Sequence, residues 1–434
     1  MVNLPDTPSS SIGIEAVSLR LAILVIASIS CRAASWLTAA KWDDRPAASQ
    51  HSTAPNGGRS FAGRPGSVAS ESWTPEALEQ PSCKVSLSAK PRVIIGASDD
   101  PSDELYRVTS AFLLPDGKIV IANAGTSQIR SYSADGRFAL SKGRAGTGPG
   151  EFSSLSGVWP LNDTLIAAFD RPQRRLSLFR TDGGFVSSRQ LELASGIRWP
   201  HAVGVLDNTI VAINGQSFES GQMGVGVVRP PSVFVRFRLD GSLVDTVLTA
   251  PGHEFFVPNV SAAFTTRALP FGLDTKFAVA SGTFYFGDTR GGEISAVAPG
   301  RRPVLVARVP LVRNRVSAGD VRAFKNSERA AARNDVQAAA ARFLDNVPFP
   351  SVFPAFDRLI VDKESNIWLR PFEYPGEGNR EWLVVLKQTQ TLCRAVLPPR
   401  TELLYIAKGV LLAVSRGEDD REEVRVYETN LTRR

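Results

Sequence analysis

The sequence is poor in the residues from which many enzyme classes are recognised. Its 434 residues include 3 histidines and 3 cysteines, and the motifs HExxH, GxSxG and CxxC are all absent. The sequence therefore gives no support for a zinc peptidase, a hydrolase with a nucleophile elbow or a thiol–disulfide oxidoreductase. A Ser-His-Asp triad stays open, because its members meet in space and need no fixed spacing.

Long runs of one charge and long apolar runs are also missing. Lys and Arg number 50 against 43 Asp and Glu, a net charge of +7, and no five consecutive residues carry charges of one sign. A modest, dispersed excess is typical of a solvated basic surface, so we expect no nucleic-acid partner. The apolar run at 21–29 is nine residues long. A membrane-spanning helix needs about 20 residues, so this run is too short to span.

The N-terminal segment has the form of an export signal. Arg20 precedes the apolar run at 21–29, as in the first two parts of a signal peptide. Ser28-Ile29-Ser30-Cys31 resembles a bacterial lipoprotein signal, in which the cysteine becomes the lipidated first residue. That pattern prefers leucine where Ser28 stands, so ordinary cleavage and a chance cysteine stay open as alternatives to lipidation of Cys31.

These features divide the chain into three parts. Residues 1–40 form the signal region, and residues 41–82, rich in Pro, Ser, Gly and Ala, form a disordered tether. Residues 83–434 form the folded domain. We therefore expect an extracytoplasmic protein that is periplasmic, secreted or held to the envelope by a lipid on Cys31.

One pattern recurs along the folded domain: a half-buried strand, a tight turn, and a very apolar strand that ends in a polar residue. The apolar strands are expected at 117–123, 163–170, 208–214, 282–288, 365–370 and 409–416. Equivalent positions in them are 46, 45, 74, 83 and 44 residues apart. A period near 45 residues with four short strands per unit is typical of a β-propeller.

The outer half of each unit is expected to be a hairpin. Asp135-Gly136, Asp182-Gly183 and Asp240-Gly241 stand between alternating strands, which predicts type I′ turns. The sixth unit lacks a fourth strand, and an unattached strand, 92–96, precedes the first unit. We therefore predict an all-β fold, a six-bladed β-propeller closed by this N-terminal strand in the last blade.

Three irregular segments are placed by this scheme. The stretch KGRAGTGPGEF, 142–152, lacks the P-loop pattern and is predicted to be a corner between blades one and two, with Phe152 filling the gap between them. Residues 215–231 are expected to be a surface loop. Residues 317–345 are expected to be a helical insertion between blades four and five that begins at Ser317, either packed on the rim or acting as a lid.

Residues 116–152 carry a resemblance to a known group. DGKIVIANAGTSQIRSYSADGRFALSKGRAGTGPGEF is similar to the first blade of bacterial extracytoplasmic six-bladed β-propeller proteins, which resemble NHL-repeat propellers. The resemblance extends from about residue 92 to residue 427. It implies the fold and an exported protein, and it implies little chemistry, since most members of that group have no assigned activity.

The ends of the apolar strands provide the candidate ligand-binding residues, which are Asn123, Asp170, Asn214, Asp288 and Arg370. Asn and Asp oxygens are suitable ligands for Ca²⁺, and propeller lactonases hold an axial Ca²⁺ with such ligands. Strand-end Asn and Asp also commonly hydrogen-bond to loop backbone. Arg370 favours an anion over a cation.

Cysteine and histidine give two further expectations. Cys83 and Cys393 either pair, which would fasten the N-terminal strand to a neighbouring blade, or remain two buried thiols. Only His201 and His253 lie in the folded domain, which is too few for the metal site of NHL-type peptide-amidating lyases.

The sequence thus favours a monomeric, non-enzymatic binding module that takes a peptide, glycan or protein on one face. The alternative is a Ca²⁺-dependent lactonase-like hydrolase or a lyase with an axial site. An enzyme would bring three or more Asp, Glu, Asn or His side chains together at the axis. A binding module would present a broader face of aromatic residues and arginine.

Overall fold

The computed structural model describes most of the folded domain. The described residues are 81–98, 103–194, 196–214, 224–258, 266–331, 344–374, 380–407, 409–417 and 421–433. The predicted signal region, Cys31 and all but the end of the predicted tether lie outside them. Among these residues, no helix combines the length and the apolarity that crossing a membrane requires.

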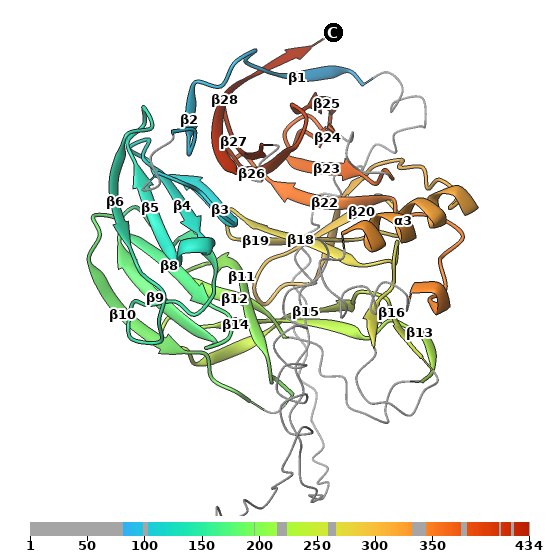
Figure 1. The fold of residues 1–434 in the computed structure, drawn as a ribbon, viewed down its shortest axis with the longest axis horizontal. Helices are drawn as coiled ribbons and strands as arrows, with labels where there is room; N and C mark the ends of the chain where they lie inside the picture. The colour runs from blue at the N-terminus through green and yellow to red at the C-terminus, as the bar shows by residue number, and fades with distance from the viewer. Residues whose placement is uncertain are drawn as a thin grey trace, which may run out of the picture. The chain divides into compact units, whose positions relative to one another are not determined.

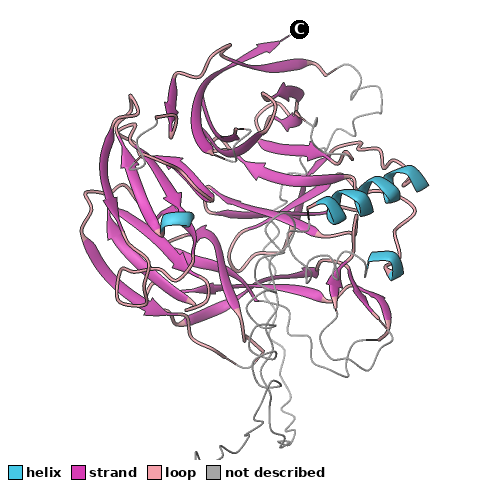
Figure 2. Cartoon of the chain, viewed as in Figure 1, coloured by secondary structure: helices cyan, strands magenta, loops and turns pink. Residues whose placement is uncertain are grey.

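The chain divides into two compact units. The smaller comprises Met1–Phe61 and Arg322–Val347, and the larger comprises Ala62–Val321 and Pro348–Arg434. Nearly all regular structure of the larger unit is β-strand (Figure 2).

Four sheets of the larger unit contain four strands each, and Figure 1 labels most of these strands. The first has the order β3 (Val108–Leu113), β4 (Ile119–Asn123), β5 (Gln128–Tyr132) and β6 (Phe138–Lys142). The second is β7 (Leu155–Pro160), β8 (Leu165–Asp170), β9 (Arg175–Arg180) and β10 (Phe185–Gln190). The third is β11 (Pro200–Leu206), β12 (Thr209–Asn214), β14 (Pro231–Phe237) and β15 (Leu243–Pro251). The fourth is β18 (Thr275–Ala280), β19 (Thr283–Asp288), β20 (Glu293–Val297) and β21 (Val304–Arg308).

The remaining strands form a larger sheet and a small one. Along the nine-stranded sheet lie β22 (Phe356–Val361), β23 (Ile367–Pro371), β24 (Glu381–Val385), β25 (Leu392–Val396), β1 (Cys83–Leu87), β28 (Glu422–Arg433), β27 (Val410–Arg416) and β26 (Thr401–Ala407), and β2 (Val93–Ile95) also pairs with β28. The small sheet has the order β13 (Gly226–Val228), β16 (Phe255–Val257) and β17 (Arg267–Ala268).

Neighbouring sheets meet through their first strands. Contacts run from β3 to β7, from β7 to β11, from β11 to β18 and from β18 to β22, and β26 contacts β3. Between β22 and β26, Arg358 forms an ion pair with Glu402, and the Lys363 N–H donates to the Ile406 carbonyl oxygen at 3.3 Å. The contacts between first strands therefore lead from β3 through the other sheets and back to β3, as in β-propellers.

The apolar strands predicted as the second of each unit are all present, as β4, β8, β12, β19, β23 and β27. Every residue of β4 is buried, whereas β6 at the outer edge of the same sheet is mostly exposed or half-buried. Continuous apolar sequence fits a strand that is covered on both faces by neighbouring sheets. Five of the described buried clusters accordingly draw their residues from two neighbouring sheets, and a sixth lies between the β22–β25 and β26–β28 parts of the nine-stranded sheet.

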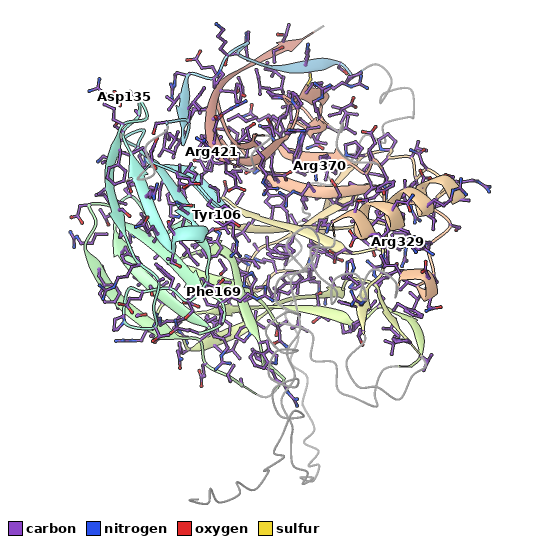
Figure 3. All side chains as sticks on the ribbon, viewed as in Figure 1. Tyr106, Asp135, Phe169, Arg329, Arg370 and Arg421 are labelled. Atoms are coloured by element: carbon purple, nitrogen blue, oxygen red, sulfur yellow. A yellow bond between two sulfur atoms is a disulfide. The ribbon has the colours of Figure 1, made fainter. Side chains whose placement is uncertain are left out.

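The expected type I′ hairpin turns are wrong. Only the glycines have positive φ, 87° at Gly136, 114° at Gly183 and 92° at Gly241, whereas a type I′ turn also needs positive φ at the preceding aspartate. In the first hairpin the Gly136 N–H donates to the Ser133 carbonyl at 2.9 Å. This is a type I turn followed by a left-handed glycine, which is why glycine is needed at one position only. Asp135 lies at the tip of this hairpin (Figure 3).

The glycine-rich stretch at 142–152 is a corner between the first and second sheets. Phe152 is fully buried, in a cluster with residues of both sheets. Gly143 has φ +79°, and a Cβ atom there would lie 2.6 Å from a carbon of the Phe152 ring. Glycine therefore provides both the left-handed turn and the space for the ring. The buried Arg175 guanidinium donates to the Thr147 and Glu151 carbonyl oxygens, each at 2.5 Å.

The N-terminal strands complete the sheet that holds the C-terminus. Strand β2 pairs antiparallel with β28, with Val93 opposite Val426, where the sequence places the strand 92–96. Strand β1, which the sequence analysis does not predict, lies between β25 and β28, parallel to the former and antiparallel to the latter. A disulfide joins Cys83 of β1 to Cys393 of β25, with the Cα atoms 4.6 Å apart.

The two predicted insertions differ from expectation in part. Helix α3 (Ala318–Ala330) begins as predicted, since Ser317 Oγ accepts a hydrogen bond from the Asp320 N–H at 3.1 Å. None of its residues is buried. Residues 332–343 lie outside the described residues, and a short helix, η2 (Leu344–Asn346), follows them. The expected surface loop at 215–231 is wrong in its second half, because Gly226–Val228 is strand β13, paired with β16.

Candidate functional site

The strand-end residues predicted as ligands occupy equivalent places and bind neighbouring loop segments. Asn123 is fully buried, accepts a hydrogen bond from the Tyr106 N–H at 2.8 Å and donates to the Glu104 carbonyl oxygen at 3.1 Å. Asp170, also fully buried, accepts from the backbone of Ser153 at 2.5 Å and from the side chain of Gln173 at 2.9 Å. Each side chain thus holds the segment that precedes the first strand of its own sheet.

Asn214, at the third strand end, also binds loop backbone, whereas Arg370, at the fifth, forms ion pairs. Asn214 accepts from the Arg198 N–H at 3.0 Å and donates to the Gly196 carbonyl at 2.7 Å. Arg370, labelled in Figure 3, donates to both carboxylate oxygens of Asp357 at 2.7 and 2.8 Å and to Glu402 at 2.9 Å. Burial acts to lower the pKa of Arg370, but the two carboxylates outweigh it and raise the pKa above its ordinary value.

All five predicted residues have hydrogen-bond or ion-pair partners in the described structure. Each makes hydrogen bonds within or beside its own sheet. In the described ranges, no three side chains of His, Cys, Asp or Glu are gathered as a metal site. Asp288 differs from the other four, because it belongs to a larger group of ionisable side chains.

That group, here called the charged cluster, lies where β18 begins and β19 ends. It consists of Arg229, His253, Asp274, Lys276 and Asp288. Arg229 Nη1 lies 2.9 Å from Asp288 Oδ2, and Lys276 Nζ lies 2.9 Å from Asp274 Oδ2. His253 Nδ1 faces the same Asp274 oxygen at 3.8 Å.

Backbone and side-chain contacts fix the charged cluster in place. Arg229 Nε donates to the Gly252 carbonyl oxygen at 2.8 Å, next to His253 in the chain. Thr275 lies directly opposite Asp288 in the β18–β19 register, so Asp274 is beside the same strand end. Burial acts to raise the pKa of Asp274, but His253 and Lys276 outweigh it and lower the pKa to about 2. Asp274 is therefore ionised at neutral pH.

Five aromatic side chains, here called the aromatic cluster, gather nearby. They are Phe271, Phe349, Phe353, Phe372 and Tyr374. Phe271 contacts the other four, with its centroid 4.9 Å from those of Phe353 and Tyr374. Phe353 is buried, and the other four rings are half-buried, so they also present area to solvent.

Shared backbone contacts place the aromatic cluster beside the charged cluster. The loop that carries Phe271 is tied to Glu254, the neighbour of His253, through hydrogen bonds of 2.8 Å from the Leu269 and Leu273 N–H groups. The Ala355 N–H donates to the Thr289 carbonyl at 2.7 Å, and Thr289 Oγ1 accepts from the Asp274 N–H at 2.9 Å. The two clusters therefore form one composite surface where the fourth sheet meets β22 and β23.

Comparisons with known proteins give neither a family nor a curated relative. No protein-family model matches the chain, and no curated protein matches it in sequence. A protein of Bacteroides fragilis that is described as exported has a TM-score of 0.46 and 14% identity, covering 81% of this chain and 95% of its own. A member of the DUF4221 family from Bacteroides vulgatus has a TM-score of 0.49 and 11% identity, covering 81% and 99%. A catalytically inactive virginiamycin B lyase from Staphylococcus aureus has a TM-score of 0.38 and 10% identity, covering 81% and 96%.

The sequence analysis missed most of the composite surface. His253 was visible as one of two histidines in the folded domain, and Phe372 and Tyr374 closely follow the predicted Arg370. Nothing in their spacing links them to Arg229, which lies in the segment expected to be a surface loop. The pairing of β13 with β16 brings the segment of Arg229 next to that of His253, and no local sequence pattern predicts this pairing.

The other histidine gives a pH prediction. His201 is the second residue of β11 and lies beside the Phe169 ring, with the ring centroids 5.9 Å apart. Burial and, to a smaller extent, the charge of Arg171 lower the pKa of His201 to about 3. In the unfolded chain a histidine titrates near about 6.5, so acid protonates the unfolded state first and folding stability falls between these two values. We expect the titration of His201 to lower the free energy of unfolding by about 2–3 kcal/mol at pH 4.5 relative to pH 7.

Urea unfolding of the wild type and of His201→Gln at both pH values checks this expectation. The variant should lose less stability between pH 7 and pH 4.5 than the wild type does, because glutamine does not titrate. An equal loss in both proteins would show that His201 does not contribute to acid sensitivity. The comparison uses only the change with pH, so a uniform loss of stability in the variant does not affect it.

Proposed function

We propose that the protein is an exported six-bladed β-propeller, similar to NHL-repeat propellers, that binds a ligand on the composite surface without acting on it as an enzyme. The four four-stranded sheets would be four blades, β22–β25 the fifth, and β26–β28 with β2 the sixth. The cyclic contacts between first strands support this count, as does the pairing of β2 with β28.

One observation carries the binding function: the half-buried rings of the aromatic cluster beside the charged cluster. Aromatic side chains and arginine are enriched where proteins bind partners, because each combines apolar area with polar atoms. Phe353 and Phe372 are stacked, with centroids 5.2 Å apart, and form a rigid support for the more exposed rings. A rigid apolar patch of this kind suits a sugar ring or an aromatic peptide side chain.

The test is a binding screen with arrays of peptides and of envelope oligosaccharides. We expect binding to a subset of one array, and its loss in Phe372→Ala. Phe138→Ala is the matched control, since Phe138 is 56% exposed on the outer strand β6, in a different sheet. Absence of binding from both arrays, or equal loss in the two variants, would contradict the proposal.

The enzyme alternative is separated by thermal unfolding with EDTA and then with added Ca²⁺. A binding module without a metal site should unfold at the same temperature in both conditions. A rise with Ca²⁺ that Asp170→Ala or Asp288→Ala abolishes would instead support a Ca²⁺-dependent hydrolase or lyase, because binding to the native state alone raises its stability.

A further inference from the structure

Two nitrogen atoms of the charged cluster are buried and make no hydrogen bond to the residues that the structure describes. They are Arg229 Nη2 and His253 Nε2. The side chain of Arg229 is 12% exposed and that of His253 is 24% exposed. A buried polar atom without a partner is costly and needs an explanation, and a bound molecule that supplies the partner is one such explanation.

The remaining contacts of both side chains fix the direction of these two atoms. The guanidinium of Arg229 is held at Nε by the Gly252 carbonyl oxygen and at Nη1 by Asp288. The imidazole of His253 is held by Asp274 on its Nδ1 side and by the Phe255 ring, whose centroid lies 5.2 Å away. Both side chains are therefore fixed in position through their other polar atoms.

The two aspartates of the charged cluster do not exclude an oxyanion. Asp288 is compensated by Arg229 and Asp274 by Lys276, and Glu254 beside them accepts a hydrogen bond from the Leu273 N–H at 2.8 Å. Neither aspartate is left uncompensated to repel an anion. A planar carboxylate matches the Arg229 edge, and its second oxygen can accept a hydrogen bond from His253 Nε2 when that nitrogen carries a proton.

We propose that Arg229 Nη2 and His253 Nε2 together bind a carboxylate of the ligand while its ring lies on the aromatic cluster. This inference rests on the proposed binding function and adds the chemical class of the ligand. The hydrogen bonds from the Leu269 and Leu273 N–H groups to Glu254 hold the segment of Phe271 beside that of His253. A peptide ending in an aromatic residue and a uronic acid both carry this combination of carboxylate and ring.

The test uses two pairs of probes that differ in the carboxylate. One pair is N-acetylphenylalanine and its amide, and the other is glucuronate and glucose. Binding to the full chain is followed by NMR of the His253 imidazole, which His253→Gln assigns among the 3 histidines of the sequence. We expect the carboxylate of at least one pair to bind at least about tenfold more tightly than its neutral partner. The pair that binds identifies the source as peptide or glycan.

Two variants tie the preference to the proposed atoms. Arg229→Lys keeps a positive charge near Asp288 but removes Nη2, and His253→Gln removes the imidazole. Each should reduce carboxylate affinity by at least about tenfold while leaving the neutral probe unchanged. Equal affinity for charged and neutral probes, no binding of either carboxylate, or a preference that survives both variants would overturn the proposal.

The result also separates this proposal from the one it rests on. Probes that bind equally well with and without the carboxylate, and that Phe372→Ala weakens, would leave the aromatic binding function standing and reject the carboxylate site. Probes that need the carboxylate but are insensitive to Phe372→Ala would keep the carboxylate site and reject the aromatic platform.

Discussion

Replacing Cys393 with serine is expected to lower the free energy of unfolding by about 2–5 kcal/mol. The disulfide to Cys83 closes a loop of 310 residues, which is long enough for a large restriction of the unfolded chain. Both cysteines are buried in the cluster between β22–β25 and β26–β28. The measurement is guanidinium unfolding of the oxidised protein and of the variant at equal concentration.

The control for this prediction is Cys83→Ala with Cys393→Ala, compared with the wild type after reduction. Both lack the cross-link, but only the variant removes the two sulfur atoms from the core. Similar losses of stability would assign the effect to the cross-link. A Cys393→Ser variant as stable as the oxidised wild type would contradict the prediction.

Phe152→Ala is expected to lower the free energy of unfolding by about 3–5 kcal/mol, because the substitution leaves a cavity between the first and second sheets. The ring is fully buried, and its centroid lies 6.1 Å from that of Phe179. Gly143 leaves space for the ring because it has no Cβ atom, and Arg175 stabilises the corner through its hydrogen bonds to two carbonyl oxygens. The cavity therefore has little freedom to collapse.

Phe138→Ala is the matched control for Phe152→Ala in urea unfolding. It removes the same atoms from a position that is 56% exposed, where a loss of less than about 1 kcal/mol is expected. A loss in Phe152→Ala no larger than this would show that the corner does not depend on the ring.

The strand pattern was predictable because its causes are local. Four or five apolar residues followed by a polar one identify a strand covered on both faces, and β4, β8 and β12 follow this rule. The strand 92–96 was predicted by counting strands per unit, because the sixth unit had three strands and needed a fourth. Strand β1 was missed because CKVSL is short and obtains its stability from two distant partners, β25 and β28.

The candidate site was only partly predictable. Asn123, Asp170 and Asn214 were correctly placed at strand ends, and their hydrogen bonds to the backbone follow from the common behaviour of Asn and Asp at such positions. The charged and aromatic clusters depend on contacts between segments far apart in the chain. Arg229 and Asp288, for example, are separated by 59 residues.

The sheet that joins β1 and β28 also sets the order in which the protein can fold. Its first strand begins at Cys83 and its last reaches Arg433, so this sheet cannot form until almost the whole chain has been delivered. Contacts of such long sequence separation form late and slowly. A chain that is exported as proposed above would therefore assemble its early sheets first, and Cys83 would remain unpaired until its partner, 310 residues further along the chain, had arrived. Disulfide formation would then depend on this final step, and a chain cut short before β25 would keep Cys83 without Cys393.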